Sequence, residues 1–118
     1  MDTIFISEIK AEVKLGVPEW EGMLPQTVLL DIEIDMPHSR SCQTDDIQDT
    51  IDYGQVVVQV RQSLAEKSFR LVEALAEHVC QLILVSHDTQ RVKVRVAKPG
   101  ILSGVKQLGV VIERNRTS

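Results

Sequence analysis

The stretch Phe69-Arg70-Leu71-Val72-Glu73-Ala74-Leu75-Ala76-Glu77 opens the second of two helical patterns in this chain. Apolar residues recur along it at the spacing of one helix face, namely Leu71, Val72, Leu75, Val79, Leu82 and Ile83. We therefore expect a helix from about Phe69 to Val85, with Ser68 as its N-cap. Such a stripe has to be buried against another layer of structure.

Glu73 would lie about one turn into this helix, at the border of the apolar face and near the positive end of the helix dipole. An ionised carboxylate there can accept two parallel N–H bonds from a planar ligand. The alternative is a solvated glutamate that only stabilises the first turn, and position alone favours this second interpretation. Glu73 is thus a candidate binding residue whose role the pattern leaves open.

A first helix is expected to begin near Asp52, which forms a capping-box pattern with Gln55 three residues later. The apolar stripe of this helix consists of Val56, Val57, Val60 and Leu64. Tyr53, the only tyrosine of the chain, would stand at the start of the helix. Taken alone, it is more typical of a packing residue with a satisfied hydroxyl than of an acid or base.

Four segments alternate between apolar and polar residues with the period of two that is typical of strands with one buried face. They cover about 8–17, 28–36, 91–98 and 108–112, and Gly16 suggests a bulge near the end of the first. The resulting order, β-β-α-α-β-β, predicts an α+β fold in which two helices cover one face of an antiparallel sheet. The 118 residues are expected to form a single domain, 1–118.

The other face of this sheet carries opposite charges on its second and third strands. The acidic row is Asp31, Glu33 and Asp35, and the basic row is Arg91, Lys93 and Arg95. Opposite charges favour the pairing of these two strands. The first and fourth strands would then be edges, and long open edges favour a closed oligomer made through strand edges.

Lys98 shares one face of the third strand with Val92, Val94 and Val96, so it ends an apolar row just before Pro99-Gly100. A lysine on the buried side of a strand end is a candidate for a lowered pKa and a proton-transfer role. The alternative is an aliphatic stem that reaches from the core to water. The spacing does not decide between the two.

Composition and charge argue against several classes of protein. The net charge of −4 and the pI of about 5.3 argue against a nucleic-acid partner, and no apolar run is long enough to span a bilayer. No secretory signal pattern is visible. Cys42 and Cys80 lack metal-ligand spacing and the histidines show no zinc-site pattern, so we expect no metal and a reduced, cytoplasmic protein.

Four short motifs resemble those of dihydroneopterin aldolases, in the same order and at similar spacings. They are Gly16-Val17-Pro18-Glu19-Trp20-Glu21, Ile51-Asp52-Tyr53, Leu71-Val72-Glu73-Ala74-Leu75-Ala76-Glu77 and Lys98-Pro99-Gly100, and the likeness continues through Gly109-Val110-Val111-Ile112-Glu113-Arg114. The resemblance implies the tunnelling fold of these pterin enzymes, whose subunits join edge to edge into rings, with two tetrameric rings stacked as an octamer. Pro18 and Lys14-Leu15 depart from residues common in the family.

The resemblance also implies an activity, the cleavage of 7,8-dihydroneopterin into 6-hydroxymethyl-7,8-dihydropterin and glycolaldehyde in folate biosynthesis. Glu73 would bind the amino group and ring N–H of the pterin, and the backbone of Leu71 and Val72 would complete the ring contacts. Lys98 would be the main proton acceptor and donor.

Two further residues take roles from the same resemblance. Glu21 would position the trihydroxypropyl side chain of the substrate together with Lys98, and Tyr53 would reach in from a neighbouring subunit. No cofactor, metal or Schiff base would be needed, because the dihydropterin already holds a C=N bond beside the bond that breaks.

The resemblance leaves alternatives. Re-closure of the same retro-aldol intermediate implies a 2′-epimerase side activity. A sister enzyme on the same fold epimerises dihydroneopterin triphosphate at C2′, and it would need a cationic patch for the triphosphate. A pterin-binding ring protein without catalysis would bind the ligand but release no glycolaldehyde.

Overall fold

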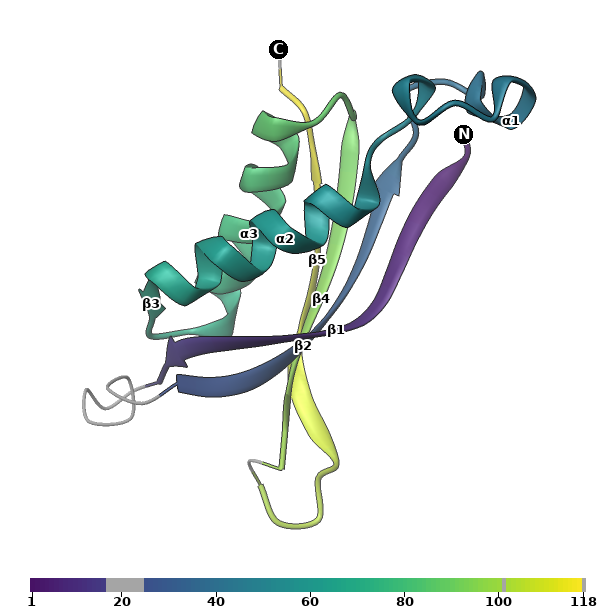
Figure 1. Cartoon of the computed structure of the whole chain (residues 1–118). Coiled ribbons are helices and arrows are strands. Elements are labelled where there is room, and N and C mark those ends of the chain that lie inside the picture. Colours follow the sequence, from purple (N-terminus) through teal and green to yellow (C-terminus); the bar gives the residue numbers. More distant parts are fainter. Residues whose placement is uncertain (17–24, 101, 118) are drawn as a thin grey trace.

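In the computed structural model, which describes residues 1–16, 25–100 and 102–117, two helices lie on one side of a curled sheet (Figure 1). The elements follow one another as β1 (Thr3–Leu15), β2 (Pro25–Asp35), α1 (Ser41–Thr44), the 3-10 turn η2 (Ile47–Asp49), α2 (Tyr53–Glu66), β3 (Ser68–Phe69), α3 (Val72–Ser86), β4 (Arg91–Pro99) and β5 (Gln107–Asn115). The predicted α+β class is therefore confirmed, with one short strand more than the pattern suggested.

The strands lie in the order β3-β1-β2-β4-β5. The pairs β1–β2, β2–β4 and β4–β5 are antiparallel, and β3 runs parallel to the end of β1. The pairing of β2 with β4 is the one that the charged rows favoured. Only the last two residues of β1, Lys14 and Leu15, pair with β3, so that edge is partly covered rather than open along its whole length.

The start of α3 differs from the prediction. Ser68 does not cap a helix at Phe69; both residues form β3, and the helix begins at Val72 with Leu71 as its N-cap. Pairing with β1 outweighs the helical pattern here, because it satisfies backbone groups that a frayed first turn would leave open. The N–H of Gly16 also donates to the carbonyl of Phe69 (3.0 Å).

The prediction of a bulge near Gly16 is wrong, because Gly16 follows the end of β1 and the bulge of this strand lies at Ser7 and Glu8. Ile6 pairs with Ile32 and Ile9 with Leu30, so two residues of β1 oppose one residue of β2. Glu8 adopts a left-handed φ of 56° at this bulge, and the carboxylate of Asp31 accepts hydrogen bonds from the Glu8 N–H (2.8 Å) and the Ser7 hydroxyl (3.1 Å).

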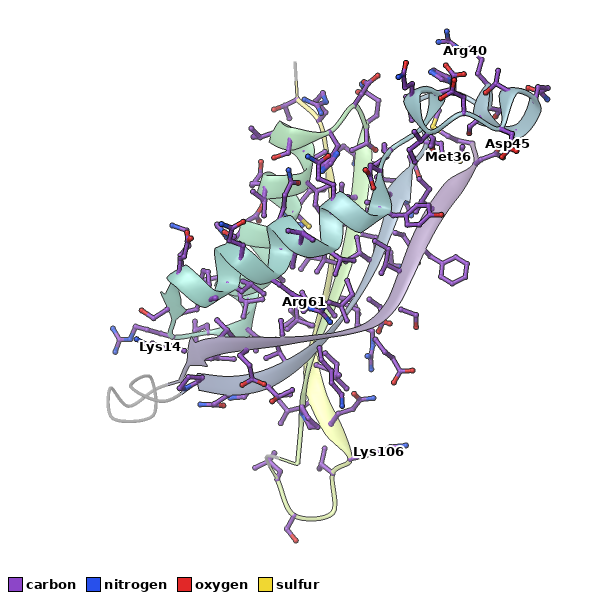
Figure 2. All side chains as sticks on the ribbon, in the orientation of Figure 1. Lys14, Met36, Arg40, Asp45, Arg61 and Lys106 are labelled. Carbon is purple, nitrogen blue, oxygen red and sulfur yellow. The ribbon has the colours of Figure 1, made fainter. Side chains whose placement is uncertain are left out.

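The core fills the space between the sheet and the helices, where side chains from both layers meet (Figure 2). Its fully buried members include Leu15, Leu30, Ile32, Ile34, Val56, Val60, Leu64, Leu75, Val79 and Ile83. Asp52 caps α2 as predicted, accepting from the N–H of Gln55 (3.1 Å). Arg61 of α2 reaches β1 and donates to the carbonyl of Lys10 (3.0 Å), which fastens the helix to the sheet. No helix in the described ranges is both long and apolar enough to cross a membrane.

The charged rows on the other face of the sheet interact as predicted. Arg95 pairs with Asp31 (3.3 Å), and Arg91 pairs with Asp35 (2.8 Å) and Glu33 (3.6 Å). These partners are partly exposed, so each pair contributes modestly to stability and mainly selects which strands lie side by side.

Candidate active site

The two hairpins of the sheet part at one end. The pairing of β2 with β4 runs from Ile34–Val92 to Leu29–Ala97. Beyond that point β2 continues beside β1 as far as Pro25, and β4 continues beside β5 as far as Pro99. Figure 1 shows the two arms diverging below the helices. We call this opening between the arms the fork.

Lys98 is the first residue of β4 past the fork, and it lies opposite Leu108 of β5. It follows Val92, Val94 and Val96, which are completely buried under the helices, and is itself half-buried. The predicted position at the end of an apolar row is thus confirmed. Lys98 is thus the residue of β4 at which the fully buried row gives way to partial exposure.

The start of α3 comes to the same end of the sheet. The helix is joined to the β1 arm through β3 and then contacts β4 and β5, so it crosses the sheet from one arm to the other. Leu71 and Glu73 are exposed here, whereas Val72 packs against the core. Glu73 is the second residue of the helix rather than a full turn inside it. Its carboxylate therefore stands at the positive, N-terminal end of the helix dipole, where a negative charge is stabilising.

No side chain caps the first turn of α3 among the described residues. The first N–H groups of a helix have no partner within the helix. The start of α3 thus offers a ligand two kinds of group: the Glu73 carboxylate as a strong acceptor and the first backbone N–H groups of the helix as donors. A flat heterocycle that carries adjacent N–H donors and a carbonyl matches such an edge.

Tyr53 lies at the far end of α2. Its side chain is 58% exposed, so it does not pack in the core of its own chain and the packing interpretation is wrong for the single chain. The 14 residues of α2 separate it from β3 and the start of α3, a length of about 20 Å. The structure places Leu71, Val72 and Glu73 at the start of α3, next to the β1–β2 arm, and Lys98 on the β4–β5 arm just past the fork. Tyr53 lies at the other end of α2.

Glu21, the remaining predicted site residue, lies outside the described residues. The two residues that bracket its segment, Gly16 and Pro25, lie at the end of the β1–β2 arm. The side-chain amide of Gln26 donates to the carbonyl of Leu15 and ties the two strand ends together.

Sequence reasoning missed β3, which holds the start of α3 in place. A strand of two residues has no period, and neither Ser68 nor Phe69 contradicts a helix. The only available signal was the aromatic residue next to a serine at the presumed helix boundary, which is also compatible with a strand.

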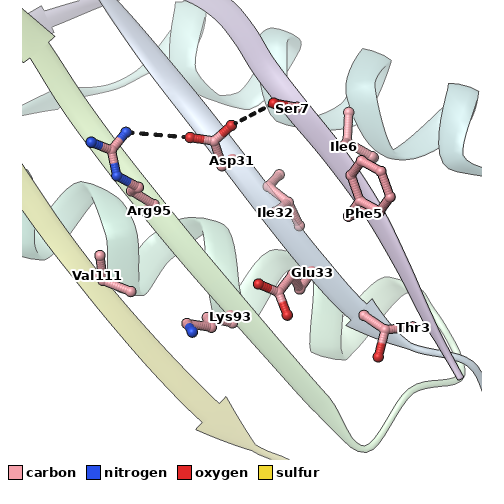
Figure 3. A pocket seen from close by; sticks show the side chains of 10 residues that line it. All are labelled: Thr3, Phe5, Ile6, Ser7, Asp31, Ile32, Glu33, Lys93, Arg95 and Val111. Carbon is pink, nitrogen blue, oxygen red and sulfur yellow. Dashed lines mark hydrogen bonds and ion pairs between the residues drawn. The ribbon is translucent and has the colours of Figure 1, made fainter. Parts of the chain in front are cut away.

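A hollow of about 480 Å³ lies on the face of the sheet that the helices leave uncovered (Figure 3). The paired Asp31 and Arg95 line it, together with Phe5 of β1 and Val111 of β5. Its described lining contains none of the predicted site residues. No group of three described histidine, cysteine, aspartate or glutamate side chains is placed to hold a metal ion.

Solved structures of other proteins share this fold. FolB from Vibrio cholerae has a similar structure, with a TM-score of 0.93 and 35% identity over 98% of both chains. The structure of Escherichia coli dihydroneopterin aldolase in complex with neopterin has a TM-score of 0.92 and 30% identity, covering 98% of this chain and 100% of that one. The curled sheet with its two helices is thus the fold of solved dihydroneopterin aldolases.

Sequence comparison leads to the family itself. The family model FolB, dihydroneopterin aldolase, matches residues 4–113. The Escherichia coli K12 dihydroneopterin aldolase is 31% identical over 114 residues, which are 97% of this chain and 93% of the relative. The chain belongs to the dihydroneopterin aldolase family.

Proposed function

We propose that this protein is a dihydroneopterin aldolase of folate biosynthesis, which cleaves 7,8-dihydroneopterin into 6-hydroxymethyl-7,8-dihydropterin and glycolaldehyde. Membership of the family carries the proposal. The relative solved with neopterin supports a pterin ligand. The proposal takes Glu73 and the uncapped start of α3 as the ring-binding part of the site and Lys98, on β4 just past the fork, as its proton-transfer group.

Glu73 would bind the pterin through its amino group and the adjacent ring N–H. These two donors are parallel and suit one carboxylate, and charge-assisted bonds of this kind contribute on the order of 1.5–3 kcal/mol each. The backbone of Leu71 and Val72 would complete the contacts to the ring. A ligand bound in this way would lie against the first turn of α3, with its side chain directed toward Lys98.

Lys98 would move the protons of the reaction, directly or through a bound water. A base removes the proton of the 2′-hydroxyl, the C1′–C2′ bond breaks, and its electron pair enters the C=N system of the dihydropterin. Glycolaldehyde leaves, and an acid then protonates C1′ of the resulting enamine. The substrate supplies its own electron sink, so we expect neither a Schiff base nor a metal. Glu21 would help to position the substrate side chain and Lys98.

Tyr53 would complete the site from a neighbouring subunit. Its exposure and its distance from Glu73 support this arrangement. Two features of the sheet favour a ring of subunits: β5 is an edge strand, and β1 pairs with β3 only at Lys14 and Leu15. We infer a homo-oligomer, with two stacked tetrameric rings as the expected form, in the cytoplasm. The same enamine can attack the other face of the glycolaldehyde carbonyl, which inverts C2′, so a 2′-epimerase side activity is expected.

Release of glycolaldehyde from purified protein and 7,8-dihydroneopterin tests the proposal. Lys98→Ala should abolish most of the release, whereas Lys93→Ala, on the same strand but on the face away from the helices, should leave it close to the wild-type rate. Binding without release would indicate a pterin-binding protein that is not an enzyme. Faster turnover of dihydroneopterin triphosphate than of the free substrate would indicate the sister epimerase.

A further inference from the structure

The start of α3 is held by contacts that lie outside its own first turn. Its N-cap, Leu71, makes no side-chain capping bond, so the segment that would bind the pterin is not fixed locally. The preceding Phe69 pairs with Leu15, and its carbonyl accepts from Gly16. The position of Phe69 therefore determines where α3 begins.

One side chain connects Phe69 with both helices. The ring of His78, in the second turn of α3, lies 5.5 Å from the ring of Phe69 with 47° between the planes, a tilted aromatic contact. The Nε2 atom of the same ring shares a hydrogen bond of 2.6 Å with the hydroxyl of Ser63 on α2. Three elements, β3, α2 and α3, thus meet at His78.

All three residues of this His78 cluster, Ser63, Phe69 and His78, are half-buried. Burial lowers the pKa of His78, and the positive charge of Lys67 lowers it further, so the ring is neutral near pH 7. A neutral imidazole can keep both contacts without bringing a charge into the space between the helices.

We propose that His78 is a positioning residue for the pterin site: through Phe69 and Ser63 it holds the segment 71–73 in the arrangement that receives the ring. The inference rests on the proposed function, because Glu73 must bind the pterin for its position to matter. Ligand binding to a segment that is ordered in advance loses less conformational entropy. Loosening the cluster should therefore weaken binding more than it slows the chemical step.

The first test is Ser63→Ala, which removes the hydrogen bond but keeps the aromatic contact. Neopterin is the probe, because its fluorescence reports binding without turnover. We expect its dissociation constant to rise about three- to tenfold, the scale of one lost hydrogen bond, and the KM for dihydroneopterin to rise similarly with kcat nearly unchanged. Ser63→Thr should keep wild-type binding, since it keeps the hydroxyl and Ser63 lines a hollow at the surface.

A matched control lies between the same two helices. His87, just past the C-terminal end of α3, shares a hydrogen bond of 2.8 Å with the side chain of Gln59 on α2. Gln59→Ala removes a comparable link but leaves Phe69 and the start of α3 in place. It should lower the unfolding temperature by a similar amount and leave neopterin binding unchanged.

Glu73→Ala separates the two hypotheses. If this variant binds neopterin as tightly as the wild type, the proposed pterin site itself is wrong. If it loses binding while Ser63→Ala does not, the pterin site stands and the positioning role of His78 is refuted. Equal weakening by Ser63→Ala and Gln59→Ala would also refute it, because the effect would then follow general stability. Should Ser63→Ala fail to fold, His78→Phe removes the same hydrogen bond with an aromatic ring in place.

Discussion

Subunit mixing tests the most consequential part of the proposed site, namely that two chains build it. Tyr53→Phe keeps Glu73, and Glu73→Ala keeps Tyr53, so each variant lacks one half of the site. Each should be a poor enzyme as a homo-oligomer. Co-refolding equal amounts of the two should produce activity that neither parent has.

The size of the expected gain follows from the fold. Tyr53 stands at one end of α2, which is about 20 Å long, and β3 with the start of α3 follows its other end. This length exceeds the span of one pterin, so the shared-site hypothesis takes the two residues from different chains. In a head-to-tail interface, each site would take Glu73 from one chain and Tyr53 from the neighbouring chain. With random mixing of equal amounts of the two variants, half of the chains keep Glu73 and the other half keep Tyr53. About a quarter of the sites should therefore carry both wild-type residues.

Glycolaldehyde release is the assay, and its maximum should approach a quarter of the wild-type rate. Native mass spectrometry has to verify that the oligomers are mixed, and unmixed parents at the same total concentration are the control. If verified mixed oligomers show no activity above the sum of the parents, Tyr53 acts within its own chain or not at all, and the shared site is refuted.

Three further outcomes are expected. Lys98→Ala should lower kcat by at least about a hundredfold, the usual scale for an acid–base group, with little change in neopterin binding; near-normal turnover would contradict its role. Activity should survive EDTA, and borohydride with substrate should leave the mass of Lys98 peptides unchanged, whereas an adduct would indicate a Schiff base. Arg116→Ala should lower the unfolding temperature without changing KM, because Arg116 donates to the carbonyls of Leu84, His87 and Thr89 at the end of α3.

The sheet and the helices were predictable because their signals are local and repeat. Val92, Val94 and Val96 alternate with charged residues, so both the strand and the face that carries Lys98 followed from a period of two. The start of α2 followed from the capping pattern of Asp52 and Gln55, since a cap is a contact between close neighbours in sequence. The acidic and basic rows added the long-range choice of which strands pair.

The remaining features depend on contacts between distant residues. β1 begins at Thr3, several residues before the predicted strand. The pattern missed this part because the bulge at Ser7 and Glu8 shifts the inward-facing positions by one residue between Ile6 and Ile9, which breaks the alternation. Pairing with β1 shortens α3. Arg116 lies past the last predicted strand, and its contact with the carbonyl of His87 at the end of α3 has no local signal in the sequence. The exposure of Tyr53 did not follow from its place at the start of a helix, because the helical pattern does not show how far the first turn extends past the sheet.

The bulge also connects the two faces of the sheet. Asp31 lies on the face away from the helices, where its carboxylate holds the backbone of Glu8 and pairs with Arg95 of β4. It thereby stabilises the bend of β1 and the pairing of β2 with β4 close to the point where that pairing ends. A bulge increases the local twist of a sheet, and the twist directs the β1–β2 arm away from the β4–β5 arm. The divergence of the two arms, just before Lys98 on β4, is therefore shaped in part by charged residues on the opposite face, none of which would contact the substrate.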